Sequence, residues 1–307
     1  MRPSKRQPEA GEPLGVLGEA ITSPQNALVK RAASLRQRKF REREGAFLVE
    51  GADLVLAGIA AGQRPQTVFV AADRADEFAR LVWGALDGTT GPVPGVFPVA
   101  ERVAAKISSL EQPPDAMAVF ALPSRPVAAR LQVGAEPLVV YADGVADPGN
   151  MGTLVRAAAA FGAAAFATSP GSTDLFSPKT VRASMGAIFG LPLVPDARLG
   201  DLLAELSLER VYGLAAHEGM SLRDADLRRP AALIVGAERS GISPTARAHV
   251  TDLLTIPMAP GAQGVVESLN AGVAGAIALY ELSCRFAASA HSDEPLRPPR
   301  KDDDGRH

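Results

Sequence analysis

The sequence predicts an α/β protein with two domains, the second built on a mostly parallel sheet. Short apolar runs alternate with longer segments of helical pattern along most of the chain, which is typical of a sheet covered by helices. In the C-terminal half these runs are apolar without interruption, as in strands that are buried on both faces. The length of 307 residues, 47% of them hydrophobic, is sufficient for two cores.

The first domain is expected at residues 19–122, after a polar tail at 1–18 that contains three prolines and is expected to be disordered. Helix-start chemistry around Asn26 predicts the first helix. The pattern then predicts helices at 25–37, 53–61, 75–86 and 99–110, and strands at 47–49, 67–70 and 117–121. Residues 87–98, rich in Gly, Pro and Thr, are expected to form a loop.

A linker is expected at 123–136, the second domain at 137–289 and a second disordered tail at 290–307. The strands predicted for the second domain are 138–141, 165–167, 211–215, 233–235 and 253–256. The helices predicted for it include 153–161 and 179–189. The last helix is expected to begin with Ser268 as its N-cap. Small apolar residues lie on all its sides, which predicts a helix buried all round.

Composition excludes several classes of protein. The formal net charge of −2 leaves only local patches for nucleic-acid contact. The single cysteine, Cys284, rules out an internal disulfide framework, and no apolar run is long enough to span a membrane, so a cytoplasmic location is expected. The sequence contains neither a P-loop nor a dinucleotide fingerprint. Its four histidines are far apart, so no metal site is expected.

Basic residues gather near the N-terminus. The run contains Lys30, Arg31, Arg36, Arg38, Lys39, Arg41 and Arg43, opposed within it only by Glu42. One interpretation is a solvated helix face, which is what most charge runs are. The other is a surface that contacts phosphates, because lysine and arginine release counterions from nucleic acid on binding.

Three separated stretches resemble, in the same order, the three motifs of the SpoU (TrmH-like) family of RNA ribose 2′-O-methyltransferases, within the SPOUT superfamily. They are DGVADPGNMGTLVRAAAAFG at 143–162, LIVGAERSGIS at 233–243, and IPM…SLN…LYE between 256 and 282. The resemblance implies a C-terminal SPOUT domain with a deep trefoil knot, S-adenosylmethionine as cofactor and a homodimer. Residues 21–51 also resemble a small α/β RNA-binding domain found in many members, which favours the phosphate-contact interpretation and an RNA substrate.

The resemblance also implies site residues. Backbone groups of Gly236, Ile256 and Leu269 are expected to hold the cofactor. The residues expected to serve catalysis are Asn150, Arg156, Glu238, Ser268 and Asn270. Lys179 and Arg182 match a further family segment and are expected either to contact phosphates or to be ordinary surface charges.

Arg156 is expected in a largely buried helix, where an arginine needs a partner. The partner could be Glu238, in a structural ion pair. The resemblance instead places the guanidinium at the reacting hydroxyl, where it would grip phosphate or hydroxyl and stabilise negative charge. A guanidinium is effectively never deprotonated, which argues against its acting as the general base.

The sequence departs from the family pattern in motif two, at Ala237 and Arg239, and in the extended loop at 259–267. The leading hypothesis is a methyltransferase that acts on the ribose 2′-hydroxyl of ribosomal RNA, whether as a housekeeping or a resistance enzyme. The alternatives are a transfer-RNA 2′-O-methyltransferase, a catalytically silent RNA-binding protein of the same fold, and a conventional doubly wound nucleotide-dependent enzyme.

Overall fold

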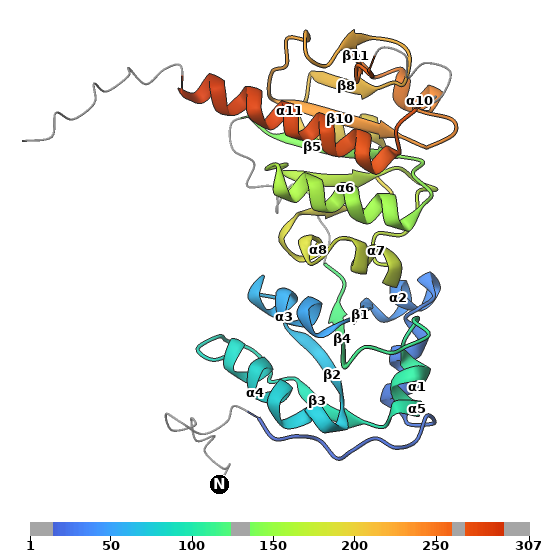
Figure 1. Ribbon diagram of the computed structural model, residues 1–307, viewed down its shortest axis with the longest axis vertical. Coiled ribbons are helices and arrows are strands. Elements are labelled where there is room, and N and C mark those ends of the chain that lie inside the picture. Colours follow the sequence, from blue (N-terminus) through green and yellow to red (C-terminus); the bar gives the residue numbers. More distant parts are fainter. Residues whose placement is uncertain (1–14, 124–135, 260–267, 292–307) are drawn as a thin grey trace, which may run out of the picture.

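The computed structural model describes residues 15–123, 136–259 and 268–291 (Figure 1). Two sheets, each with its own helices, lie one beyond the other along the long axis of the molecule (Figure 1). The predictions for 1–14, for 124–135 in the linker, for 260–267 in the extended loop and for 292–307 fall outside the described residues.

The N-terminal sheet has four strands in the order β1-β4-β2-β3. β4 is antiparallel to both its neighbours, and β2 and β3 are parallel. The strands are β1 Ala46–Glu50, β2 Pro65–Ala71, β3 Gly95–Val99 and β4 Ala116–Ala121. The helices are α1 Ala27–Ser34, α2 Arg38–Glu44, α3 Ala52–Ala60, α4 Ala75–Ala85 and α5 Glu101–Ile107, with the 3₁₀ turn η1 Ala72–Arg74 before α4. Apolar side chains of α1 and α5 pack on one face, and those of α3 and α4 on the other.

Two predictions for this domain are wrong in detail. The expected loop at 87–98 contains most of β3, because Val96 and Val99 point into cores despite the turn residues around them. The expected helix at 25–37 ends at Ser34, and α2 forms from part of the basic run. Gly45, with φ of 58°, then turns the chain into β1.

The C-terminal sheet has seven strands in the order β7-β6-β5-β10-β8-β11-β9, and every pairing in it is parallel. This confirms the predicted fold class. The strands are β5 Leu138–Asp143, β6 Ala165–Thr168, β7 Leu193–Val194, β8 Arg210–Leu214, β9 Met220–Ser221, β10 Ala231–Gly236 and β11 Asp252–Thr255.

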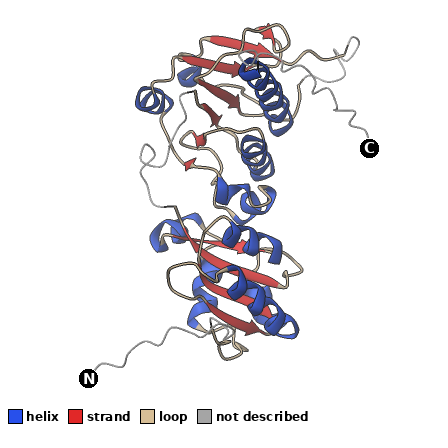
Figure 2. Ribbon diagram, turned by 90° about the vertical axis from the view of Figure 1, so that its left-hand side faces the viewer, coloured by secondary structure: helices blue, strands red, loops and turns tan. Residues whose placement is uncertain are grey.

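Two long helices, α6 Pro148–Ala160 and α11 Ala271–His291, lie side by side on one face of this sheet (Figures 1 and 2). Residues of α9 Leu199–Leu206 and α10 Pro244–Arg247 pack against the other face. The helix expected at 179–189 is two short helices, α7 Pro178–Ala183 and α8 Ala187–Gly190. Met185 and Gly186 have φ of 50° and 89°, which ends a right-handed helix between them.

Two expectations for the last helix are wrong: its N-cap residue and its burial on all sides. Its N-cap is Asn270, whose side-chain oxygen accepts the backbone N–H of Val273 at 3.2 Å; Ser268 lies before the helix and is exposed. The helix is buried on one side only, because Val273, Ile277 and Tyr280 are exposed. The trefoil knot that the resemblance implies stays a prediction.

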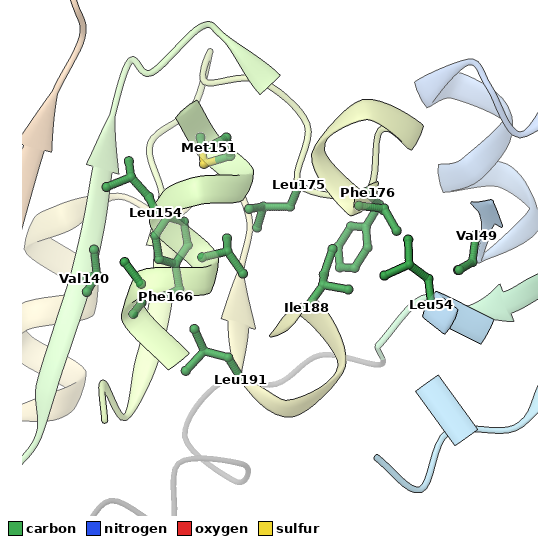
Figure 3. Packing of buried hydrophobic residues seen from close by; sticks show 14 of the residues in the cluster. Val49, Leu54, Val140, Met151, Leu154, Phe166, Leu175, Phe176, Ile188 and Leu191 are labelled. Carbon is green, nitrogen blue, oxygen red and sulfur yellow. The ribbon is translucent and has the colours of Figure 1, made fainter. Parts of the chain in front are cut away.

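Apolar packing continues from one domain to the other (Figure 3). Val49 and Leu54 from the N-terminal domain belong to the same buried cluster as Phe176 and Ile188 from the C-terminal domain (Figure 3). The rings of Phe47 and Phe176 lie 5.1 Å apart across this boundary. The two domains therefore share a packed contact in addition to the covalent linker.

Candidate active site

The carboxyl ends of the central strands meet at one edge of the C-terminal sheet, as parallel strands require. A cleft of about 500 Å³ opens there, within the range of small-molecule sites. The three predicted cofactor residues, Gly236, Ile256 and Leu269, all line it. Its other lining residues include Glu238 and Ser268, so motifs two and three both reach the cleft.

Gly236 ends β10 at a point where no side chain fits. A Cβ added there would lie 2.3 Å from the carbonyl carbon of Gly241 and 2.4 Å from the nitrogen of Ile242. Ala237 and Gly241 close this tight loop with two backbone hydrogen bonds, of 3.0 and 2.9 Å. The loop therefore folds back over the strand end, and the missing side chain of Gly236 lets the two backbone segments come close beside the cleft.

The cleft fits the expected cofactor in its chemistry. Apolar side chains of Leu214, Val235 and Ile256 offer surface for an adenine ring, and the strand ends bring backbone polar groups beside it. Leu269, two residues before the first residue of α11, also lines the cleft. These residues would hold S-adenosylmethionine mainly by shape and backbone contacts.

Three polar side chains, one from each motif, form a hydrogen-bonded chain beside the cleft. Nδ2 of Asn150 donates to Oε1 of Glu238 at 2.6 Å, and Nδ2 of Asn270 donates to Oδ1 of Asn150 at 2.8 Å. Asn270 also caps α11 with its own side-chain oxygen. Because each amide is held at both ends, the orientation of Asn150 is fixed by the other two motifs.

Asp147 fixes the start of α6. Its side-chain oxygen accepts the backbone N–H of Asn150 at 2.8 Å, and Lys179 of α7 lies 3.4 Å from its other oxygen. This hydrogen bond, together with the positive charge of Lys179, lowers the pKa of the Asp147 carboxyl. The cap therefore stays ionised and holds Asn150 at the first turn.

Arg156 is not placed as expected. It is exposed on α6, whereas a largely buried environment was predicted. Glu238 bonds to Asn150, and Arg156 has no ion-pair partner among the residues that the structure describes. It also lies six residues beyond Asn150, about 240° around the helix, so the two side chains leave α6 on different sides. The predicted Arg156–Glu238 ion pair is absent from the described part of the molecule.

The predicted RNA-contacting cations fall into two groups. Lys30, Lys39 and Lys179 are exposed. The arginines are engaged within the protein: Arg36 donates to the carbonyl oxygen of Ser108 at 2.9 Å, and Arg38 contacts both Glu42 and Asp196.

Arg41 and Arg182 differ most clearly from the predicted contacts with RNA. The side chain of Arg41 is 4% exposed and pairs with Asp174. Arg182 is partly buried and pairs with Glu50, whose side chain is fully buried. Their guanidinium groups bind carboxylates of this chain, so neither is available as an ordinary surface cation.

Sequence reasoning missed one wall of the cleft. Residues 214–217, the last residue of β8 and the three that follow it, line the cleft and include the exposed His217. The available signal was the position of this segment at the end of a buried strand, because strand ends of a parallel sheet meet at one edge.

No group of three or more potential metal ligands is found in the described ranges. No helix in those ranges is long and apolar enough to cross a membrane.

Comparison with known proteins identifies the family. Residues 137–280 match the model of the SpoU rRNA methylase family, and residues 26–118 match the MRM3-like substrate-binding domain. The 23S rRNA (guanosine(2553)-2′-O)-methyltransferase RlmP of Bacillus subtilis is 32% identical, over 85% of this chain and 98% of its own length. The chain belongs to the SpoU family.

Other methyltransferases resemble most of the chain. The mitochondrial rRNA methyltransferase 3A of Danio rerio is 30% identical over 87% of this chain and 70% of its own. The structure of the SpoU methyltransferase AviRb from Streptomyces viridochromogenes, in complex with AdoMet, superposes with a TM-score of 0.74 and 28% identity. That superposition covers 86% of this chain and 99% of AviRb. The predicted family, and with it the predicted enzyme class of RNA methyltransferases, is confirmed.

Proposed function

We propose that this protein transfers a methyl group from S-adenosylmethionine to a ribose 2′-hydroxyl of ribosomal RNA. One observation carries the proposal: Asn150, Glu238 and Asn270, from three distant motifs, are hydrogen-bonded to one another beside a cleft lined by Gly236. Two relatives that are matched over 98% and 90% of their own length, from Bacillus subtilis and Streptomyces viridochromogenes, are named 23S rRNA 2′-O-methyltransferases, which supports ribosomal RNA as the substrate.

S-adenosylmethionine supplies an electrophilic methyl group, so the protein contributes mainly placement. Gly236, Ile256 and Leu269 orient the cofactor through backbone groups. Asn150, held by Glu238 and Asn270, positions the ribose. Glu238 accepts the hydroxyl proton, directly or through water, and Ser268 at the mouth of the cleft contributes a hydroxyl to the same site.

We further propose that the protein is a homodimer in which Arg156 serves the partner's cleft. The exposed sides of α6 and α11 form one surface, because the helices lie side by side over the same sheet face (Figure 2). That surface carries Arg156 together with the exposed apolar residues Val273, Ile277 and Tyr280. Burying these apolar side chains against a second copy would place two Arg156 residues at the interface.

RNA is proposed to lie along the side of the molecule that carries α2, α7 and the first turns of α6 and α11 (Figure 1). The exposed lysines Lys39 and Lys179 belong to this side, and Lys30 on α1 extends it. Arg36 and Arg38 are exposed in part and would add to the same positive surface while keeping their internal bonds. The expected cytoplasmic location stays a prediction.

The decisive experiment incubates the protein with labelled S-adenosylmethionine and ribosomal RNA, followed by mapping of 2′-O-methyl positions. We expect methylation at a single nucleotide. Cofactor binding measured by calorimetry, without transfer to ribosomal or transfer RNA, would instead support a catalytically silent RNA-binding protein. Transfer to transfer RNA alone would reject the ribosomal substrate.

A further inference from the structure

The carboxylate of Glu50, at the end of β1, is fully buried at the domain boundary. It accepts hydrogen bonds from the backbone N–H of Ser109 at 2.5 Å, from Oγ of Ser109 at 2.7 Å and from Oγ of Ser108 at 3.0 Å. Among the described residues, Arg182 of the C-terminal domain is the cation that pairs with it. A buried carboxylate is costly unless it is paired, so this contact strongly favours one arrangement of the two domains.

Arg182 is connected rigidly to the active site. It belongs to α7, which packs against α6 without space for a side chain at Gly152. A Cβ added to Gly152 would lie 2.4 Å from Cβ of Ala183 and 2.7 Å from the carbonyl oxygen of Thr180. Asn150 lies two residues before Gly152 on the same helix. A displacement of α7, which carries Arg182, would therefore press on α6, the helix that carries Asn150.

A second buried pair strengthens the same boundary. The guanidinium of Arg41 donates to Asp174 through Nε, at 3.1 Å, and through Nη2, and its Nη1 donates to the carbonyl oxygen of Leu35 at 2.6 Å. The other carboxylate oxygen of Asp174 accepts the backbone N–H of Phe176 at 2.8 Å. Each group is thus held from both domains. The exposed Arg38–Asp196 pair, by contrast, is of the kind that contributes little.

We propose that the Glu50–Arg182 pair, supported by Arg41–Asp174, is a positioning device that holds the substrate-binding domain at one distance and angle from Asn150. RNA bound to that domain then presents one nucleotide to the cleft. Arg182 is a positioning residue in this account and contacts no RNA. The inference rests on the proposed function, because selecting one nucleotide for methylation requires methyl transfer. A buried ion pair can fix one arrangement of its surroundings even where it adds little net stability.

The test uses the double variant Glu50→Gln/Arg182→Met. It removes the buried carboxylate and its partner cation together, while the glutamine amide can still bond to Ser108 and Ser109, so that folding is preserved. Spin labels at the exposed positions Asp76 and Glu205, both changed to cysteine in a Cys284→Ser background, report the distance between the domains by pulsed electron paramagnetic resonance. Arg38→Met, which breaks the exposed pair, is the matched control for the distance measurement alone.

We expect a narrow distance distribution for the parent chain and for Arg38→Met, and a broad one for the double variant. Methyl transfer by the double variant should fall about 100-fold, as for a misplacement of roughly 1 Å, and spread to neighbouring nucleotides. Cofactor affinity measured by calorimetry should not change, because the cleft is intact.

An unchanged, narrow distribution in the double variant would reject the positioning device. A broad distribution with full-rate transfer to the same single nucleotide would reject the role of the ion pairs in selecting that nucleotide. An absence of any transfer by the parent chain would reject the proposed function, while the distance measurement would still decide whether the buried pairs hold the domains.

Discussion

At the scale of single residues, Gly236 determines whether the cofactor cleft can form. The chain approaches itself so closely there that even one additional carbon would overlap the backbone of Gly241 and Ile242. This constraint is independent of backbone dihedral angle, since Gly236 is not among the residues with positive φ. The glycine is required for close approach rather than for conformational freedom.

We therefore predict that Gly236→Ala weakens binding of S-adenosylmethionine at least about tenfold, because the folded-back loop must move out of place. Calorimetry measures this directly. The control is Gly84→Ala on α4, where an added Cβ meets nothing within 4 Å. Equal affinities for the two variants would show that this part of the backbone does not hold the cofactor.

Arg156 offers a second test at this scale. Because it is exposed and makes no ion pair within the described residues, Arg156→Ala should leave folding and cofactor binding unchanged and abolish methyl transfer. Activity assays and calorimetry on the same sample separate the two effects.

The same variant tests whether Arg156 acts across a dimer. Arg156→Ala is mixed with Gly236→Ala at a cofactor concentration too low to fill the Gly236→Ala cleft, and subunits are exchanged. Part of the activity should return, because one mixed cleft has both an intact wall and an arginine from its partner. No recovery in verified mixed dimers would place Arg156 in its own subunit's site.

At the scale of elements, the start of α6 shows what the sequence could and could not predict. Motif one was identified from its letters, but the helix was expected to begin near residue 153, whereas it begins at Pro148. Asp147 and Pro148 form an ordinary N-cap and first position, a local signal that was available. The partners of Asn150 could not be predicted, because Glu238 and Asn270 are brought to it only by the fold of the sheet.

The basic run at 30–43 shows a pattern that was visible in the sequence but whose internal partners were not. Its composition left a solvated helix face and an RNA surface both open, and the family resemblance favoured RNA; yet Arg41 is buried against Asp174, far along the chain. A carboxylate that pairs across a domain boundary leaves no periodic pattern in the sequence. The parallel sheet and the predicted cofactor residues were accessible through the strand pattern and the family resemblance, whereas the division of arginines into surface and interior required the structure.

For the cap of α6 we predict that Asp147→Ala lowers the free energy of unfolding by about 1 kcal/mol at neutral pH. The folded state depresses the pKa of this carboxyl, so its contribution is complete above the unfolded pKa and is lost as pH falls through the folded pKa. Denaturant unfolding of parent and variant should therefore converge in strongly acidic solution. A difference independent of pH would show that the ionised carboxylate is not the capping group.

The exposed lysines on α1, α2 and α7 lead to a prediction about RNA binding. Changing Lys30, Lys39 and Lys179 to glutamate should weaken RNA binding and reduce the slope of its salt dependence by roughly 0.7–0.9 for each phosphate that is no longer neutralised. Filter binding over a series of salt concentrations measures this. Arg80→Glu, an exposed position on α4, is the control; a slope equal to that of the control would make the lysines ordinary surface.

At the scale of the whole molecule, the exposed apolar side of α11 bears on assembly. Ile277→Asp should convert a dimer to monomers, because it puts a charge into the centre of the proposed interface. Sedimentation velocity reports the change. Leu81→Asp, at another exposed apolar position, should leave the dimer intact. A monomeric parent chain would contradict the proposed assembly.

The strand order has a consequence for how this chain can be made. β10 occupies the place between β5 and β8, although both of those strands precede it in the sequence, and Leu138 of β5 pairs opposite Ala231 of β10. As the chain leaves the ribosome, the middle of the sheet therefore stays open until β10 has been synthesised. Contacts between such distant residues form slowly, and the unfilled slot exposes unpaired backbone groups in the interim. A nascent chain stalled just before β10 should therefore be more susceptible to proteases than one stalled after it.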